Sequence, residues 1–145
     1  MRQLNPYLSF NGQAEEAFNF YRSVFGGELT MMRWGDNPHS ADFSDEEKKG
    51  VMHVSLPVGD SVIIGSDWIE SMGELARGTN FQVAVFPESR DDADRLFAGL
   101  SEGGKVMMPM ADQFWGDYFG SFTDKFGIQW MIDYDANGKN QERQN

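Results

Sequence analysis

The side chains best suited to chemistry in this sequence lie in the run VMHVSL, residues 51–56. Side chains alternate between the two faces of a β-strand. The apolar residues at even positions of this run therefore share one face, and Val51, His53 and Ser55 share the other. If the apolar set packs under a helix, His53 and Ser55 face a cleft. His53 is then a hydrogen-bond partner for a ligand or a general base, because imidazole titrates near neutral pH. The alternative is a structural histidine that bonds a neighbouring strand.

Further polar and aromatic side chains could line the same cleft. Asp67 ends the run SVIIGSD and could accept a hydrogen bond from a ligand or from His53. An aspartate that follows a strand also commonly caps a turn, so this structural role stays open. Tyr7 and Tyr118 could present a ring and a hydroxyl to the cleft, or could lie on its rim or at an interface.

The segment FWGDYFGSFTDKFGIQWMID, residues 114–133, is rich in aromatic rings and glycines. Trp115 lies in a glycine-flanked loop, where a ring is not automatically buried, so we expect it to line the cleft or to contact a second subunit. In GIQWMID, alternation sends Trp130 to a helix-facing core and leaves Gln129 and Met131 toward the cleft. Gly127, in the turn before this strand, is expected to have a positive φ.

Composition excludes several classes of partner and of site. The chain has 145 residues and a formal net charge of −11, and such an acidic surface repels the phosphates of nucleic acids. It has no Cys, which excludes a disulfide, a thiolate nucleophile and a Cys-ligated metal. The P-loop, Rossmann and GxSxG motifs are also missing, so nucleotide binding or serine hydrolysis by those routes has no support.

The sequence gives no sign of membrane insertion or export. No run approaches the roughly eighteen apolar residues of a transmembrane helix. The opening MRQLNPYLSF also lacks the pattern of a signal peptide. We therefore expect a cytoplasmic protein with no membrane partner.

The elements that would position these residues occur in the same order twice. Strand, helix and three strands are predicted in each half, and both helices end in Gly-Gly before a strand that carries Met-Met. Ser44 with Glu47, and Ser89 with Asp92, have the spacing of helix N-terminal capping pairs. The predicted elements are strands 4–10, 28–34, 51–58, 61–67, 80–86, 105–110, 118–123 and 128–134, with helices at 13–25 and from 89 to the glycines at 103–104.

These paired modules resemble the glyoxalase/bleomycin-resistance/extradiol-dioxygenase superfamily, also called vicinal oxygen chelate. NPYLSFNGQAEEAFNFYRSVFGGEL, VMHVSL, GSD and QFWGDYFGSFTDKFGIQWMI resemble its PhnB-like branch. The resemblance implies an α+β fold in which paired βαβββ modules form an open, cup-shaped mixed sheet. It implies one domain over residues 1–145, with modules at about 4–70 and 78–135, a polar tail at 136–145, and a homodimer.

The resemblance also locates the superfamily's metal ligands, which are His and Glu. The corresponding positions fall, to within one residue, at Pro6, Ile64, Phe81 and Met131. None of these side chains is a ligand for a divalent ion of the kind expected there. We therefore expect no metal and no cofactor.

Three functions follow from these observations. The first is binding of a small apolar or aromatic molecule in a cleft, without chemistry or metal. The alternative is a metal-dependent lyase or dioxygenase of glyoxalase type that uses a non-standard site around His53. The third is a purely dimer-forming protein. Whether the chain is an enzyme stays open at this point.

Overall fold

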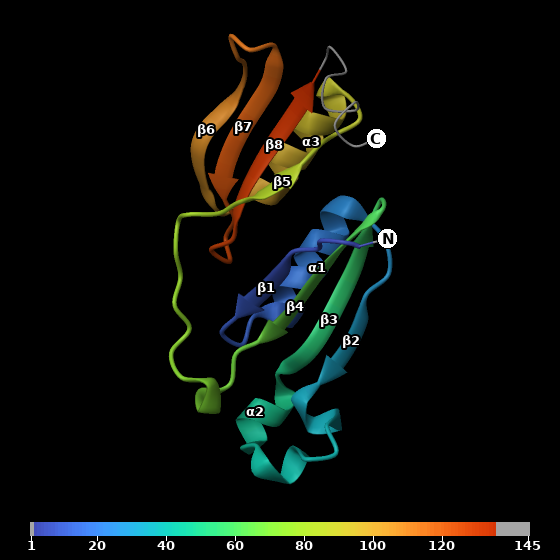
Figure 1. Cartoon of the computed structure of the whole chain (residues 1–145), viewed down its shortest axis with the longest axis vertical. Helices are drawn as coiled ribbons and strands as arrows, with labels where there is room; N and C mark the ends of the chain where they lie inside the picture. The colour runs from blue at the N-terminus through green and yellow to red at the C-terminus, as the bar shows by residue number, and fades with distance from the viewer. Residues whose placement is uncertain (1, 136–145) are drawn as a thin grey trace. The chain divides into compact units, whose positions relative to one another are not determined.

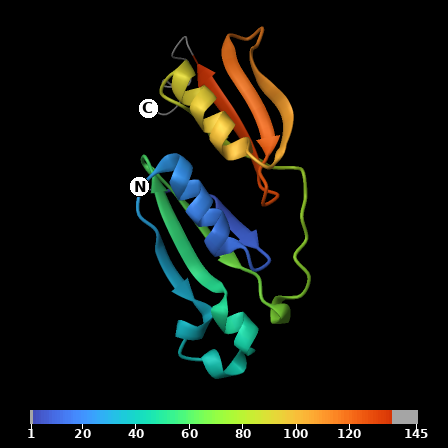
Figure 2. The same ribbon diagram turned by 180° about the vertical axis from the view of Figure 1, so that it is seen from behind.

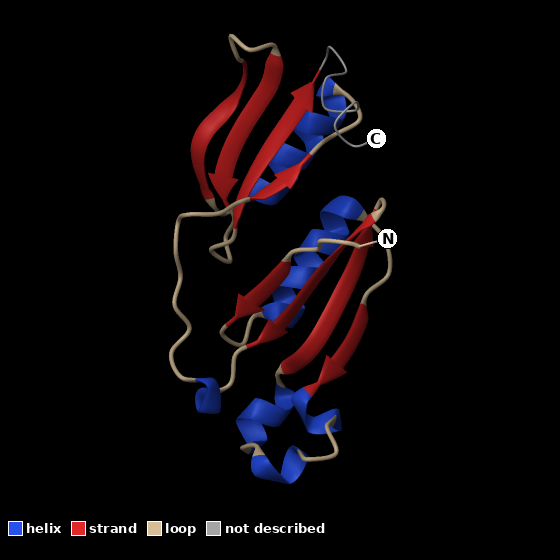
Figure 3. Cartoon of the chain, in the orientation of Figure 1, coloured by secondary structure: helices blue, strands red, loops and turns tan. Residues whose placement is uncertain are grey.

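The computed structural model describes residues 2–135, and the polar tail predicted over residues 136–145 lies outside them. The chain divides after Arg77 into two units (Figure 1). Each unit contains one four-stranded sheet, called sheet A in the first unit and sheet B in the second. Figure 3 distinguishes the strands from the helices and loops.

The first unit has a βαβββ order with short helices inserted before its third strand. The strands of sheet A lie in the order β1-β4-β3-β2, and only the β1–β4 pair is parallel. Short 3-10 helices lie at Trp34–Asp36, Ser40–Asp42 and Glu70–Met72. The main elements are β1 (Tyr7–Phe10), α1 (Ala14–Phe25), β2 (Thr30–Arg33), α2 (Asp45–Lys49), β3 (Val51–Val58) and β4 (Ser61–Asp67).

The second unit repeats the same topology. Sheet B has the order β5-β8-β7-β6, again with one parallel pair, β5 with β8. The α+β class and the paired βαβββ modules are therefore confirmed. The elements are β5 (Val83–Val85), α3 (Arg90–Ser101), β6 (Lys105–Asp112), β7 (Asp117–Thr123) and β8 (Gln129–Asp135).

Each long helix covers one face of its own sheet, as Figure 2 shows from behind. In the first unit, Phe18 and Tyr21 of α1 are fully buried together with Leu56 of β3. In the second unit, Leu100 of α3 and Trp130 of β8 are fully buried, so the prediction that Trp130 belongs to a helix-facing core is confirmed. Among the described residues, no helix of the same unit covers the opposite face of either sheet, which we call the helix-free face.

Local sequence explains where the elements begin and end. Ser44 and Glu47 form a reciprocal capping box at the start of α2, and the Ser89 hydroxyl accepts a hydrogen bond from Asp92 N at the start of α3. Both caps were predicted. The first predicted strand is shorter than expected because Pro6 has no N–H, although its carbonyl accepts a hydrogen bond from Ile64 N at 3.0 Å. Gly127 has φ 90, as predicted for its turn.

One predicted orientation in β3 is wrong. Val51 was expected to share a face with His53, but Val51 is only 1% exposed and belongs to the core. The register between β2 and β3 shifts there, since Met32 pairs with His53 whereas Arg33 pairs with Val51. This β-bulge inserts one extra residue into the alternation and turns Val51 to the helix-covered side.

A glycine in β4 provides a test of how tightly α1 packs on sheet A. A Cβ atom added at Gly65 would lie 2.6 Å from a ring carbon of Phe18 and 2.8 Å from the Leu8 carbonyl oxygen. We expect Gly65→Ala to lower the free energy of unfolding by roughly 1–3 kcal/mol, because the core cannot absorb the extra methyl group. Urea denaturation followed by circular dichroism measures the loss.

Gly78→Ala is the matched control for this substitution. Its added Cβ would approach only the side-chain oxygen of Asn80, at 3.2 Å. The Asn80 side chain can rotate away, so we expect a change within about 0.5 kcal/mol. Equal effects of the two substitutions would contradict tight packing at Gly65.

Candidate functional site

The helix-free face of sheet A brings together three of the predicted site residues. Strand pairing places Tyr7 beside Ile64, and Ile64 beside Ser55, so these three side chains form one row across the sheet. His53 pairs with Met32 in the neighbouring row. Because Leu8, Val54 and Gly65 occupy the alternate positions toward α1, both rows point away from the helix.

Some polar groups on this face are held by hydrogen bonds within the unit. The Tyr7 hydroxyl donates a hydrogen bond to the Ser66 hydroxyl at 2.9 Å, and Ser66 is 8% exposed. Tyr7 is 56% exposed, and His53 and Ser55 are half-buried. The face therefore combines accessible rings and thioether groups with a small number of fixed polar atoms.

The helix-free face of sheet B carries the remaining aromatic and methionine candidates. Met131 pairs with Ser121 of β7, and Ser121 pairs with Met108 of β6. Trp115 is 45% exposed, and its ring lies 6.2 Å from that of Phe119 in an edge-to-face arrangement. Met131, predicted to face a cleft, is half-buried, and Trp115, predicted to line the cleft or contact a second subunit, is exposed in this unit.

Gln129 has a positioning role that sequence did not reveal. Its amide nitrogen donates hydrogen bonds to the carbonyl oxygens of Gly78 at 3.0 Å and Phe81 at 2.9 Å. These bonds hold the segment that leads into β5. The nitrogen of Gln129 is thus engaged by the backbone of its own unit.

Asp67 lies on the helix-covered side of sheet A, opposite the face that carries His53. Asp67 is 3% exposed, and its carboxylate accepts hydrogen bonds from Ala14 N and from Val51 N, each at 2.9 Å. Ala14 is the first residue of α1, so the negative charge also favours the helix N-terminus. Asp67 therefore joins the ends of three elements and does not contact His53.

Tyr118 also lies on the helix-covered side of its sheet. Its hydroxyl donates a hydrogen bond to the Asp94 carboxylate at 2.6 Å, and this bond raises the pKa of Tyr118 above its ordinary value. The guanidinium of Arg90 lies over the Tyr118 ring at 4.0 Å and forms two hydrogen bonds with Asp112. These bonds lower the pKa of the Asp112 carboxyl, and the cluster fastens α3 to sheet B.

A pocket of about 360 Å³ lies in the first unit, beside α1 and α2. We call it the α1–α2 pocket. Four segments line it: the loop after β1 with the start of α1, the end of β2 with Trp34, α2 with the start of β3, and the end of β4 with the residues after it. Its lining includes Trp34, Trp68, Glu47 and Glu70. Sequence analysis missed this pocket. The sequence features that belong to it are the tryptophan directly after GSD and the charged residues 45–49. Only the folded loops bring these features together.

Comparison with known proteins identifies the family. Residues 3–132 match the model of the Glyoxalase/Bleomycin resistance protein/Dioxygenase superfamily. The chain belongs to this superfamily. It is also 32% identical over 138 residues to Protein YjdN of Escherichia coli (strain K12), covering 89% of this chain and 92% of YjdN.

Solved structures agree with this assignment. Protein PA1353 from Pseudomonas aeruginosa is 37% identical, with a TM-score of 0.83 over 93% of this chain and 98% of PA1353. The PhnB protein from Bacillus cereus has the same fold, with 23% identity and a TM-score of 0.73 over 92% of this chain and 99% of its own. These relatives fit the PhnB-like branch of the superfamily that the sequence resembles.

The positions expected to hold the superfamily's metal do not fit one in this chain. Pro6, Ile64, Phe81 and Met131 offer no nitrogen or oxygen ligand from their side chains. Within residues 2–135, no group of three or more His, Cys, Asp or Glu side chains is placed to hold a metal ion. The described helices also include none long and apolar enough to cross a membrane.

The structural role of Asp67 can be tested by removing its charge. Asp67→Asn replaces one carboxylate oxygen with an NH2 group. The remaining carbonyl oxygen can accept from one of the two backbone N–H groups, and the NH2 group then faces the second N–H. We expect the free energy of unfolding to fall by about 2 kcal/mol, because a buried hydrogen bond to a charged acceptor is lost. Chemical denaturation measures this change.

The control is Asp60→Asn, which changes the same chemical group in the exposed turn between β3 and β4. We expect Asp60→Asn to change the free energy of unfolding by at most about 0.5 kcal/mol. A loss for Asp67→Asn no larger than that of the control would contradict the structural role of Asp67.

Proposed function

We propose that this superfamily member binds a small apolar or aromatic molecule on the helix-free face of sheet A, without a metal at the superfamily positions. The observation that carries the proposal is the set of polar side chains gathered there among accessible apolar ones. Tyr7, Ser66, Ser55 and His53 are the polar members.

The chemistry of this face favours an apolar ligand with a few polar atoms. Met32 is 44% exposed beside His53, and its flexible thioether adapts to the shape of a ring. Tyr7 offers the face of its own ring on the same side of the sheet. Ligand sites of this kind use a small number of polar groups to orient a mostly apolar molecule, which is the role we assign to His53 and Ser55.

Met131 and Phe119 supply a comparable surface on sheet B. Both project from the helix-free face of the second unit, and Ser121 beside them is 5% exposed. Asp67 and Gln129 are not ligand contacts in this proposal. Their polar atoms hold backbone groups in place and so act as positioning residues.

We also propose that the protein is a homodimer. Large apolar side chains are exposed along β6 and the loop that follows it, including Met107 at 58%, Phe114 at 98% and Trp115 at 45%. Exposed apolar groups gathered in this way are typical of surfaces covered by another protein. Sedimentation equilibrium at micromolar concentration should give the mass of two chains, whereas a strict monomer would contradict this part of the proposal.

Ligand binding is tested with 2-naphthol, an uncharged aromatic probe with one hydroxyl. We expect saturable binding in isothermal titration calorimetry. His53→Ala should weaken it about fivefold, because one hydrogen bond to the ligand is worth about 1 kcal/mol.

His39→Ala is the matched control, since His39 lies in an exposed loop and not on sheet A. It should leave the affinity for 2-naphthol unchanged. If the probe binds equally well to the wild type and to both variants, its site lies elsewhere and the proposal fails.

A further inference from the structure

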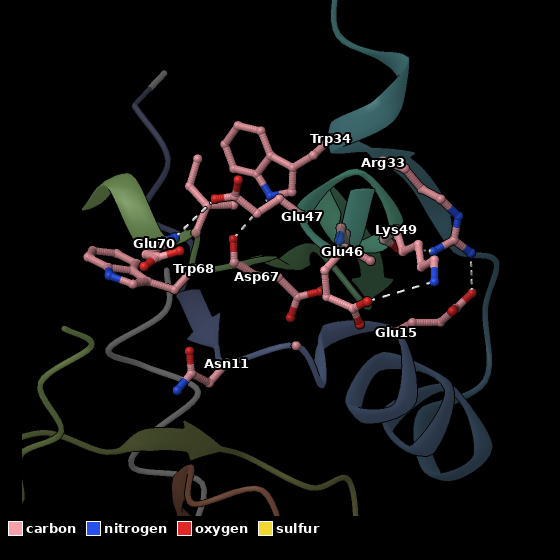
Figure 4. Close-up of a pocket in the computed structure, with 14 residues that line it drawn as sticks. Asn11, Glu15, Arg33, Trp34, Glu46, Glu47, Lys49, Asp67, Trp68 and Glu70 are labelled. Atoms are coloured by element: carbon pink, nitrogen blue, oxygen red, sulfur yellow. Dashed lines mark hydrogen bonds and ion pairs between the residues drawn. The ribbon is translucent and has the colours of Figure 1, made fainter. Parts of the chain in front are cut away.

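The α1–α2 pocket is separate from the helix-free faces. Its volume of about 360 Å³ is within the range of small-molecule sites. Two indoles, from Trp34 and Trp68, form part of its wall (Figure 4). None of the residues assigned to ligand binding on sheet A lines it.

One part of the pocket has balanced charges. Arg33 forms an ion pair with Glu15 at 2.7 Å and also donates a hydrogen bond to the Lys49 carbonyl. Lys49 forms a longer ion pair with Glu46 at 3.7 Å. Figure 4 draws both ion pairs on the same side of the view. The basic side chains that line the pocket, Arg33 and Lys49, therefore already have acidic partners.

The other part of the pocket carries negative charge without a basic side chain to balance it. Glu47 accepts hydrogen bonds from the backbone of Ser44 and Glu70, and Asp67 accepts them from Ala14 and Val51. The Glu47 pKa is lowered, chiefly by the Ser44 backbone N–H. Within the described part of the chain, Glu47, Asp67 and Glu70 form no ion pair.

The two indoles beside these carboxylates each have one N–H group, and each N–H already donates a hydrogen bond to a backbone carbonyl. Trp34 Nε1 donates to the Asp67 carbonyl at 3.2 Å, and Trp68 Nε1 donates to the Gly73 carbonyl at 2.9 Å. Both rings are held in place by these bonds and can offer only their π faces to a ligand. The face of an indole carries partial negative charge and attracts cations.

We propose that the α1–α2 pocket binds an organic ammonium ion, a protonated amine carried on a small apolar or aromatic body. The ammonium group lies near Glu70, Glu47 and Asp67, and the apolar body lies against Trp34 and Trp68. An anion would meet three carboxylates and no free indole N–H. A hydrated metal ion has no apolar body to pack against the indoles, whereas an organic amine does.

The test uses phenethylammonium chloride with the full chain labelled with ¹⁵N, at neutral pH and low salt. We expect the indole N–H signals of Trp34 and Trp68 to shift saturably, while those of Trp115 and Trp130 stay in place. Neutral 2-phenylethanol, which has a similar size, should bind at least about tenfold more weakly, because the charge interactions with the carboxylates and rings are lost. Phenylacetate should cause no shift.

Glu70→Gln and Glu74→Gln are a matched pair of variants. Both glutamates are exposed and both changes remove one charge, but only Glu70 lines the pocket. Glu70→Gln should weaken phenethylammonium binding about fivefold, as expected for an exposed ion pair of about 1 kcal/mol, and Glu74→Gln should leave it unchanged.

Three results would overturn the proposal. These are shifts confined to Trp115 or Trp130, equal affinity for the ammonium ion and the alcohol, and an unchanged affinity in Glu70→Gln. His53→Ala should not alter phenethylammonium binding. The outcome is therefore independent of the 2-naphthol site on sheet A.

Discussion

One helix covers one face of each four-stranded sheet, and this constraint determines which residues are available for function. A strand alternates its side chains between the two faces, so every core residue that packs on α1 or α3 has neighbours that point the other way. Leu8, Val54 and Gly65 pack toward α1, which leaves Tyr7, His53 and Ser55 on the helix-free side. The candidate ligand face thus follows from the packing of the core.

Buried aspartates keep the ends of these elements in place. Asp67 accepts hydrogen bonds from the first residue of α1 and the first residue of β3. Asp124 has a related role in the second unit, where it accepts from the backbone of Phe126 and Ile128 and from the indole of Trp130. In both units a carboxylate satisfies donors that would otherwise be buried without partners. These residues hold the scaffold, and the ligand site proposed on sheet A lies on the opposite face of that sheet.

Sequence predicted the regular parts of this fold well. The bounds of β3 and β4, the serine caps of α2 and α3 and the core position of Trp130 depend on local spacing, which the sequence displays directly. Val51 was misplaced because a β-bulge depends on the register with β2, which no local pattern reveals.

Features that depend on distant backbone groups could not be predicted from sequence. Gln129 was expected to face a cleft, and its amide nitrogen also donates hydrogen bonds to two backbone carbonyl oxygens, at sequence separations of 51 and 48. The α1–α2 pocket joins residues from four separate segments, so it exists only once the loops have folded. The helix-free face was predictable because it needs only strand alternation, whereas the pocket needs tertiary structure.

The proposed binding of ligands on the helix-free face of sheet A can be tested directly with two adjacent isoleucines of β4. Ile64 lies on that face beside Tyr7 and Ser55, whereas Ile63 is 4% exposed and belongs to the core under α1. With protein labelled at its Ile and Met methyl groups, the decisive measurement is the set of nuclear Overhauser effects from the ring protons of bound 2-naphthol. We expect contacts to Ile64 and Met32 and none to Ile63. Contacts to Ile63, or to neither isoleucine, would contradict binding on this face.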